Sequence, residues 1–234
     1  DIEGLALRIA ANPDAPGLAN LLSRLARFVG IEIDTAGAVD TDHALAWASL
    51  AGAAVASATR SLSDAARFLL HALFEKADFS DAALLAAFGA AARGLLRFAW
   101  ASDPPMASTV NNAIRFVGKS FASEPAESRA LLDQILREPH FSAHADKEAT
   151  WLTEQIMPIA RSDPDFAAEI YRTLFTQKIT DDGTSWFGGA PSRILPLSSN
   201  RRQDYEHCRY SLGCAMPEFF ALSVPHAMRA MIDG

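Results

Sequence analysis

The sequence has few cysteines and no excess of basic residues. Only Cys208 and Cys214 occur among 234 residues, so the chain contains no disulfide framework, and a cytoplasmic location is expected. The 21 Lys and Arg residues against 28 Asp and Glu residues give a formal charge of −7. A chain of this charge lacks a general attraction to phosphate backbones and anionic lipids. We therefore expect neither nucleic acid nor a membrane as its main partner.

Long apolar runs and secretion signals are also missing. The longest stretch without acidic or basic residues runs from His43 to Thr59, which is shorter than the roughly 20 apolar residues of a bilayer span. The chain begins at Asp1 without an initiator Met or a leader segment, which indicates a piece of a longer protein. Because 50% of the residues are hydrophobic and only 21% are charged, we expect one folded domain over residues 1–234.

The composition favours helices throughout. Alanine, the strongest helix former, occurs 45 times, whereas strand-like β-branched runs are nearly absent outside Phe28 to Ile33. Apolar residues recur at spacings of three and four, as in Leu69-Leu70-Leu73-Phe74. We predict an all-α fold with helices at about 5–11, 17–30, 42–60, 63–76, 80–100, 105–121, 125–137, 145–161, 164–176, 201–213 and 224–232.

Four of these helices are expected to start at a Ser-x-Pro sequence. Ser, or the acid that can follow it, accepts hydrogen bonds from the free N–H groups of the first turn. Pro is tolerated there because its missing donor would have no partner in any case. The four prolines are Pro104, Pro125, Pro164 and Pro225.

Two of the segments repeat one pattern. SEPAESRALLDQIL from Ser123 aligns with SDPDFAAEIYRTLF from Ser162 at an offset of 39 residues, close to the roughly 40 to 47 residues of some helical repeats. Pro158 falls inside the helix expected before the second copy and should bend it. This arrangement resembles HEAT and armadillo repeats, although Ala168 and Glu169 stand where an early Arg would be expected. The resemblance implies a HEAT-like helix-pair superhelix, and an irregular multi-helix bundle is the alternative.

The helical pattern stops in one long segment, QKITDDGTSWFGGAPSRILPLSSN at 177–200. It holds three glycines, two prolines and several Ser, Thr and Asp residues, which predicts a loop. Loops longer than roughly 12 to 15 residues are uncommon in compact domains unless they bind something or are disordered. Apolar residues such as Trp186 favour an ordered loop.

A candidate anion site lies at the end of this loop. Arg193, Arg201 and Arg202 are expected near a helix N-terminus, where free N–H groups and the helix dipole favour anions. With Tyr205 and Trp186 they form the predicted ligand-binding residues, for a phosphate or a nucleotide, either in a binding domain or in an enzyme with its site at this loop and helix start (177–209). Alternatively, these arginines pair with acidic neighbours and hold the loop, because no phosphate-binding glycine motif accompanies them.

Other chemical groups give weaker signals. His140 and His144 have i,i+4 spacing, but Pro139 favours a loop and no metal-site glutamate is present, so no metal is expected. His207 and Cys208 are adjacent on a helix and point about 100° apart, which does not suit a nucleophile pair. No nucleophile elbow occurs. We predict no catalytic residues and no cofactor.

A second resemblance involves the segment SRILPLSSNRRQDYEHCRYSL, which starts at Ser192. It is similar to a segment in the helical region of large bacterial multidomain ATP-binding proteins of the STAND signalling class. That resemblance implies an accessory or sensor region whose nucleotide-binding domain lies elsewhere in the parent chain. The expected partners are a protein or other domains of the same chain, with a homodimer through an exposed face of the small-residue helix at 43–59 as a further possibility.

Overall fold

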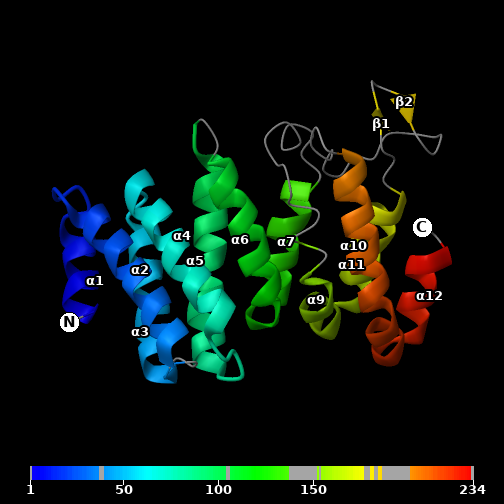
Figure 1. Cartoon of the computed structure of the whole chain (residues 1–234), viewed down its shortest axis with the longest axis horizontal. Coiled ribbons are helices and arrows are strands. Elements are labelled where there is room, and N and C mark those ends of the chain that lie inside the picture. The colour runs from blue at the N-terminus through cyan, green and yellow to red at the C-terminus, as the bar shows by residue number, and fades with distance from the viewer. Residues whose placement is uncertain are drawn as a thin grey trace. The chain divides into compact units, whose positions relative to one another are not determined.

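The computed structural model describes residues 2–36, 40–103, 106–136, 152, 154–176, 180–181, 184–185 and 201–232 (Figure 1). For 30–36, 107, 136, 171–176, 180–181, 184–185, 201–209 and 211–212 it describes the backbone alone.

The described residues confirm an all-α fold. They form eleven α-helices, one 3-10 helix and a single pair of two-residue strands. The elements are α1 (Ile2–Ala11), α2 (Leu18–Ala36), α3 (Thr41–Ala56), α4 (Arg60–Lys76), α5 (Ala82–Ala101), α6 (Ala107–Lys119), η1 (Phe121–Ser123), α7 (Pro125–Leu136), α9 (Ile156–Ser162), α10 (Pro164–Thr176), β1 (Thr180–Asp181), β2 (Thr184–Ser185), α11 (Arg201–Leu222) and α12 (Val224–Ile232).

Two helices continue well past their predicted C-terminal ends. Helix α2 continues past Gly30 to Ala36, and α11 continues past residue 213, through Pro217, to Leu222. In α11 the extension has a packing reason, because Met216 and Phe219 are both buried. Burial of that face outweighs the backbone hydrogen bond that Pro217 cannot donate.

The predicted kink at Pro158 is wrong. Helix α9 begins at Ile156, after a turn at residues 154 and 155, so Pro158 lies in its first turn. The N–H groups of a first turn have no partner within the helix, so proline costs no hydrogen bond there and bends nothing. The expected helix over 145–161 is therefore interrupted, and its first residues lie outside the described part of the chain.

The two copies of the repeated pattern start as predicted. Helix α7 begins at Pro125 and α10 begins at Pro164, 39 residues later. At the second start, Asp163 Oδ1 accepts a hydrogen bond from the Phe166 amide at 2.9 Å, which caps the helix.

The two other Ser-x-Pro sequences behave differently from each other. Helix α12 begins at Val224, directly after Ser223, as the pattern predicts. Ser102 instead ends a helix, since its hydroxyl donates to the Phe98 carbonyl at 2.8 Å at the end of α5. Helix α6 then starts only at Ala107, behind Met106, which provides no side-chain cap.

The chain divides into two compact units, Asp1–Glu124 and Pro125–Gly234. The boundary falls inside the Ser123-Glu124-Pro125 sequence, where the amino-acid pattern indicates only a helix start. No shift in composition marks the division, and the sequence analysis treated both units as one domain.

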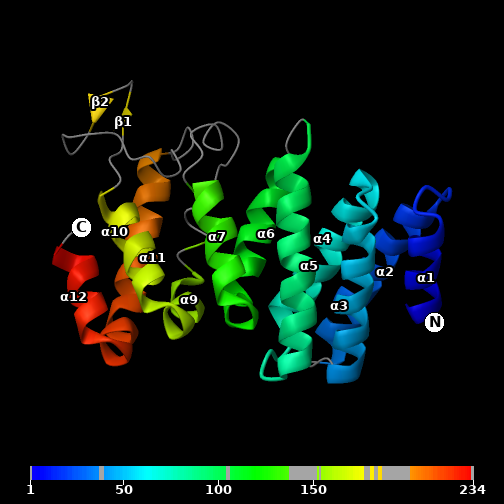
Figure 2. The same cartoon turned by 180° about the vertical axis from the view of Figure 1, so that it is seen from behind.

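In the first unit α5 packs against both α3 and α6, while α4 packs against α2, α3 and α6 (Figure 2). The Phe88 ring lies 5.8 Å from Phe116 and 4.7 Å from Phe79 at the centre of this packing. Within the described residues only α5 is long and apolar enough to cross a membrane by length and composition, and 50% of that window is buried. Packing inside the unit accounts for its apolar character.

The small residues of α3 serve the same unit. Ala44, Ala48, Ala51 and Ala54 are buried, and a Cβ at Gly52 would lie 3.9 Å from Ala91 Cβ of α5. Small side chains allow close packing of α3 on α5. The homodimer predicted through an exposed face of the 43–59 helix stays a prediction.

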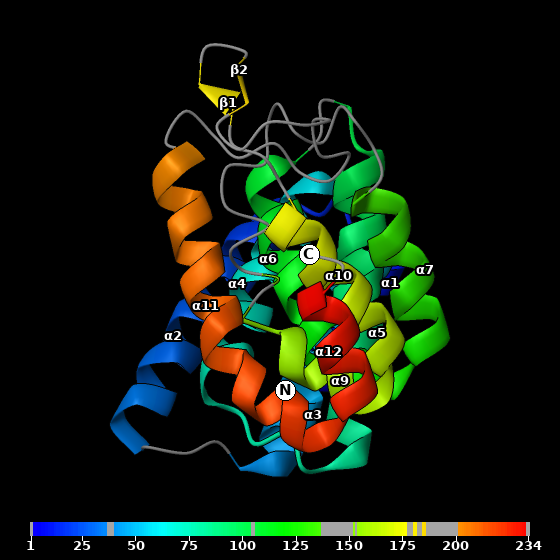
Figure 3. The ribbon, with the colours of Figure 1, turned by 90° about the vertical axis from the view of Figure 1, so that its right-hand side faces the viewer.

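In the second unit α10 contacts α9, α11 and α12, and α11 also contacts α9 and α12 (Figure 3). Phe166, Phe219 and Ile159 are buried, as is Ala227 of α12. These side chains come from four different helices, so each helix covers an apolar face of another.

Candidate functional site

The predicted anion site lies outside what the structure describes. Trp186 and Arg193 fall in undescribed residues, and of Arg201, Arg202 and Tyr205 only the backbone is described. That backbone begins α11 at Arg201, as predicted from the sequence. The ligand-binding role of these five residues stays a prediction.

Part of the long loop pairs with itself. Thr180 pairs with Ser185 and Asp181 pairs with Thr184 in an antiparallel arrangement of β1 and β2. The sequence analysis predicted no strands in this segment. A strand of two residues is too short to show the alternation of apolar and polar residues by which strands are predicted from a sequence.

A groove of about 420 Å³ lies between α2 and α4 of the first unit. Helix α2 contributes Ser23, Ala26 and Arg27 to its lining. Ala26 and, on α4, Ala72 have side chains that end at Cβ. Because two neighbouring helices both present small residues here, a furrow remains along their contact.

Helix α4 supplies one long wall of this groove. Phe68, Ala72 and Glu75 are spaced at i, i+4 and i+7, so they follow one another along one face of the helix. The Phe68 ring is 46% exposed, although it sits at the edge of an apolar furrow. The Arg67 guanidinium lies over this ring, 4.0 Å from its centre.

His71 lines the same groove and is uncharged at neutral pH. Partial burial lowers the pKa of its imidazole below the usual 6.5, and the charges of Arg115 and Arg67 lower it further, against the opposite effect of Glu75. The ring lies 6.4 Å from the Phe116 ring. At neutral pH His71 therefore adds no positive charge to the lining of the groove.

The rim of the groove has an excess of positive charge. Its lining carries Arg27, Lys76 and one carboxylate, Glu75. Arg115 Nη1 lies 3.2 Å from Glu75 Oε1 and partly neutralises it, while its guanidinium rests 4.3 Å from the centre of the Phe74 ring. Arg27 makes no ion pair among the side chains that the structure describes. Arg27 is thus a basic group that an acidic ligand could contact here.

The second unit holds a cleft of about 390 Å³ with mixed charges. Arg129 of α7 donates to Asp163 at 2.8 Å, lies 3.6 Å from Glu169 and stacks 5.0 Å from the Phe166 ring centre. Across the cleft, Arg229 of α12 lies 3.4 Å from Asp165. Each arginine has a carboxylate partner, so the cleft holds the helices together and offers no unbalanced charge to a ligand.

Beside this cleft, three side chains form a Ser, His and Asp series. Ser223 Oγ lies 2.6 Å from His226 Nδ1, and His226 Nε2 lies 3.4 Å from Asp165 Oδ1. With the imidazole proton on Nε2, the hydroxyl donates to Nδ1 and Nε2–H faces the carboxylate. The two ring nitrogens are used in the opposite order from a serine hydrolase, where the hydroxyl faces Nε2.

This series has a structural explanation. Ser223 directly precedes α12 and His226 is its third residue, which are the positions where side chains cap a helix start. The contact with Asp165 ties that start to α10. We assign these residues to the anchoring of α12.

Comparisons with family models, with curated proteins and with solved structures found no match. Function must therefore be argued from the residues themselves. Among the described residues no group of three His, Cys, Asp or Glu side chains could hold a metal ion. His140 and His144 lie outside the described part of the chain. Cys214 is an exposed free thiol, and the Cys208 side chain is not described.

The α2–α4 groove was missed in the sequence for an identifiable reason. The pattern Leu69-Leu70-Leu73 marks the buried face of α4, and those three side chains are indeed fully buried. Phe68 and Ala72 lie beside that stripe, and the sequence pattern did not single them out. An aromatic residue next to a completed apolar stripe was the available signal.

Proposed function

We propose that this chain is a non-catalytic helical scaffold or recognition domain of a larger, cytoplasmic bacterial protein of signalling type. The observation that supports this role is the α2–α4 groove, which has an apolar floor, a charged rim and walls made of two regular helices. Sites on helices are held more rigidly than sites on loops, which suits recognition of a protein segment.

A HEAT-like arrangement of helix pairs is the architecture that fits this role. The starts of α7 and α10, 39 residues apart at equivalent prolines, support it. Stacked helix pairs present extended surfaces while each pair contacts mainly its neighbours. The partner would be another protein or another domain of the same chain.

The test is a selection of helical peptides on the full chain, from a library with no bias in charge. We expect binders whose affinity falls at least about tenfold when Ala72→Phe fills the groove. The matched control is Ala86→Phe, at an exposed position of α5, which should leave binding unchanged. Circular dichroism and thermal unfolding verify that both variants fold. Failure to select any peptide that is sensitive to Ala72→Phe would contradict the proposal.

Binding of a small anion is the second candidate function. The observation in its favour is that Arg201 and Arg202 occupy the first turn of a 22-residue helix, where the free amides attract anions. In this case phosphate or a nucleotide raises the thermal midpoint of the wild-type chain and has no effect on Arg201→Ala. An unchanged midpoint across such a panel would remove this candidate.

A further inference from the structure

We propose that the α2–α4 groove binds an amphipathic helix with acidic flanks, in which apolar side chains at i and i+4 enter the furrow and Asp or Glu residues face its rim. This inference rests on the proposed recognition function and adds the chemistry of the partner.

The dimensions of the groove suit a helical ligand. Its volume of about 420 Å³ lies within the range of roughly 300 to 1,000 Å³ that is usual for binding clefts. The α4 wall extends from Phe68 to Lys76, which at about 1.5 Å per residue is roughly 12 Å or two helical turns. Two turns accommodate two successive apolar anchors of a bound helix.

The floor of the groove can accept apolar side chains without leaving a buried charge. Ala26 and Ala72 have small side chains, and Phe68 is 46% exposed, with the Arg67 guanidinium 4.0 Å from the centre of its ring. His71 is neutral at neutral pH because of burial and of Arg115 and Arg67. A ligand that covers this floor therefore displaces water from apolar surface, which is the main source of affinity in such grooves.

The rim determines the sign of the ligand's charge. Arg27 and Lys76 line the groove, and its single carboxylate, Glu75, is partly neutralised by Arg115 at 3.2 Å. A carboxylate on the ligand gains from Arg27, whereas a lysine in the same place is repelled. The formal charge of the whole chain is −7, so this local excess of positive charge runs against the charge of the molecule.

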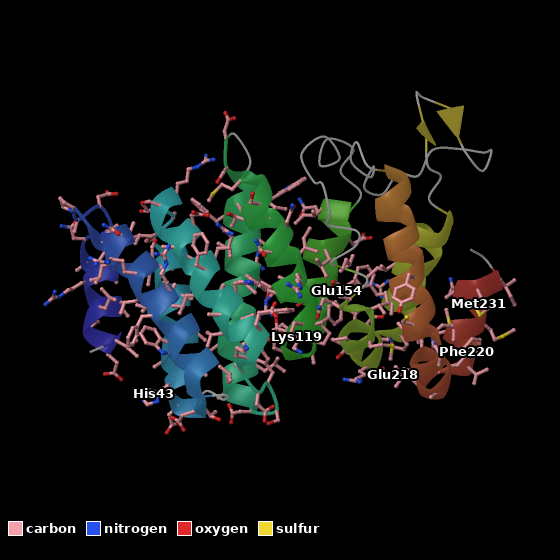
Figure 4. All side chains as sticks on the ribbon, viewed as in Figure 1. His43, Lys119, Glu154, Glu218, Phe220 and Met231 are labelled. Atoms are coloured by element: carbon pink, nitrogen blue, oxygen red, sulfur yellow. The ribbon has the colours of Figure 1, made fainter. Side chains whose placement is uncertain are left out.

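A second copy of this chain provides the most obvious competing occupant. Helix α12 has an exposed apolar stripe with the required spacing, namely Val224 (58% exposed), Met228 (42%), Met231 (55%) and Ile232 (71%). Figure 4 shows Met231 pointing away from the ribbon of α12. However, Val224–Ile232 contains His226 and Arg229 and no carboxylate. Its charge therefore mismatches the basic rim, and we assign the groove to an acidic helix of another sequence.

The experiment compares three fluorescent helical peptides on the full chain by anisotropy. Two peptides carry identical leucine anchors with either glutamate or lysine flanks, and the third has the sequence of α12. We expect the glutamate peptide to bind at least about tenfold more tightly than the lysine peptide, with an advantage that shrinks as salt is added.

Variants of the protein identify the groups responsible. The double substitution Arg27→Glu and Lys76→Glu should reverse the preference between the two flanked peptides. Arg24→Glu adds a negative charge to α2 outside the groove lining and should preserve it. If the double variant does not fold, Arg27→Gln alone should reduce the glutamate peptide's advantage by several-fold.

The outcomes separate this inference from the proposed function. If Ala72→Phe weakens binding but the glutamate and lysine peptides bind equally, or the lysine peptide binds more tightly, the inference of an acidic partner is wrong. The proposed recognition function then still stands. Tightest binding by the α12 peptide also overturns it and indicates self-association. If no peptide, including those selected from the unbiased library, is sensitive to Ala72→Phe, both proposals fail.

Discussion

Arg93 is buried, with 5% of its surface exposed, and its Nη1 donates a hydrogen bond to Ser123 Oγ at 3.0 Å. Gly89, one turn before Arg93 on α5, makes this contact possible. A Cβ at position 89 would lie 2.4 Å from Ser123 Oγ, 3.0 Å from Arg93 Nη1 and 3.2 Å from Ser120 Cβ. The buried Arg93 guanidinium and the end of η1 therefore fill the space that a side chain at position 89 would need.

Substitutions at two helical glycines should therefore have opposite effects. Gly89→Ala should lower the free energy of unfolding by about 1–3 kcal/mol, because the added methyl group displaces Ser123 and Arg93. Gly52→Ala should raise it by about 0.5–1 kcal/mol, since its Cβ meets only ordinary contact at 3.9 Å and alanine favours the helix. Urea unfolding of both variants measures the difference. Equal stability of the two variants would show that the space around Gly89 is not filled as described.

Asp163 combines a helix cap with an ion pair. Its Oδ1 accepts from the Phe166 amide at 2.9 Å, and its Oδ2 accepts from Arg129 at 2.8 Å. Asp163→Ala should cost about 2–3 kcal/mol, and Asp163→Asn should cost about 1 kcal/mol less because asparagine retains the cap.

Glu218→Gln is the control for the Asp163 variants, since its pair with Arg161 is exposed on both sides. Its loss should cost less than about 0.5–1 kcal/mol. Hydrogen exchange at the first amides of α10 reports the effect locally. Equal protection in Asp163→Ala and Glu218→Gln would contradict the assignment of the cap.

Two buried serines should respond differently to removal of the hydroxyl group. Ser63 is fully buried, and its Oγ has no hydrogen-bond partner among the described residues. Ser120 is equally buried, but its hydroxyl donates to the Phe116 carbonyl at 2.8 Å. Ser63→Ala should be neutral or stabilise by up to about 1 kcal/mol, whereas Ser120→Ala should destabilise by about 0.5–1.5 kcal/mol. Thermal unfolding of the pair tests this, and a larger loss in Ser63→Ala would reveal an additional partner for that hydroxyl.

His71 should make the protein less stable in mild acid. Its pKa is lowered below 6.5 in the folded chain, chiefly by burial, and the surrounding charges are Glu75, Arg115 and Arg67, with Arg27 and Lys76 also lining the groove. The unfolded chain, with a histidine pKa near 6.5, then binds more protons, so stability is lost as the pH falls through this value.

The comparison for His71 uses its glutamine variant. His71→Gln should lose less stability than the wild type between about pH 7.5 and about pH 5.5. His43→Gln is the control, because its side chain (labelled in Figure 4) is 73% exposed in the first turn of α3 and does not line the groove. An identical pH dependence in wild type and His71→Gln would show that His71 is not desolvated.

Much of the local structure follows from the sequence. Alanine content and apolar spacing predict nearly every described helix, and Pro125 and Pro164 predict two helix starts to the residue. These are local effects, since propensity and first-turn capping depend on residues within one or two turns. The continuation of α11 past residue 213 could not be predicted in this way, because it depends on the burial of Met216 and Phe219 against other helices.

The sequence by itself determined the all-α class of the described residues and where most of their helices lie. Only the tertiary structure decided that Phe68 and Ala72 border a furrow beside Ala26, that Arg115 neutralises Glu75, and that the chain divides after Glu124. A furrow exists only where two helices that are separate in the sequence pack with small residues facing each other. The residue pattern of one helix alone therefore does not predict such a furrow.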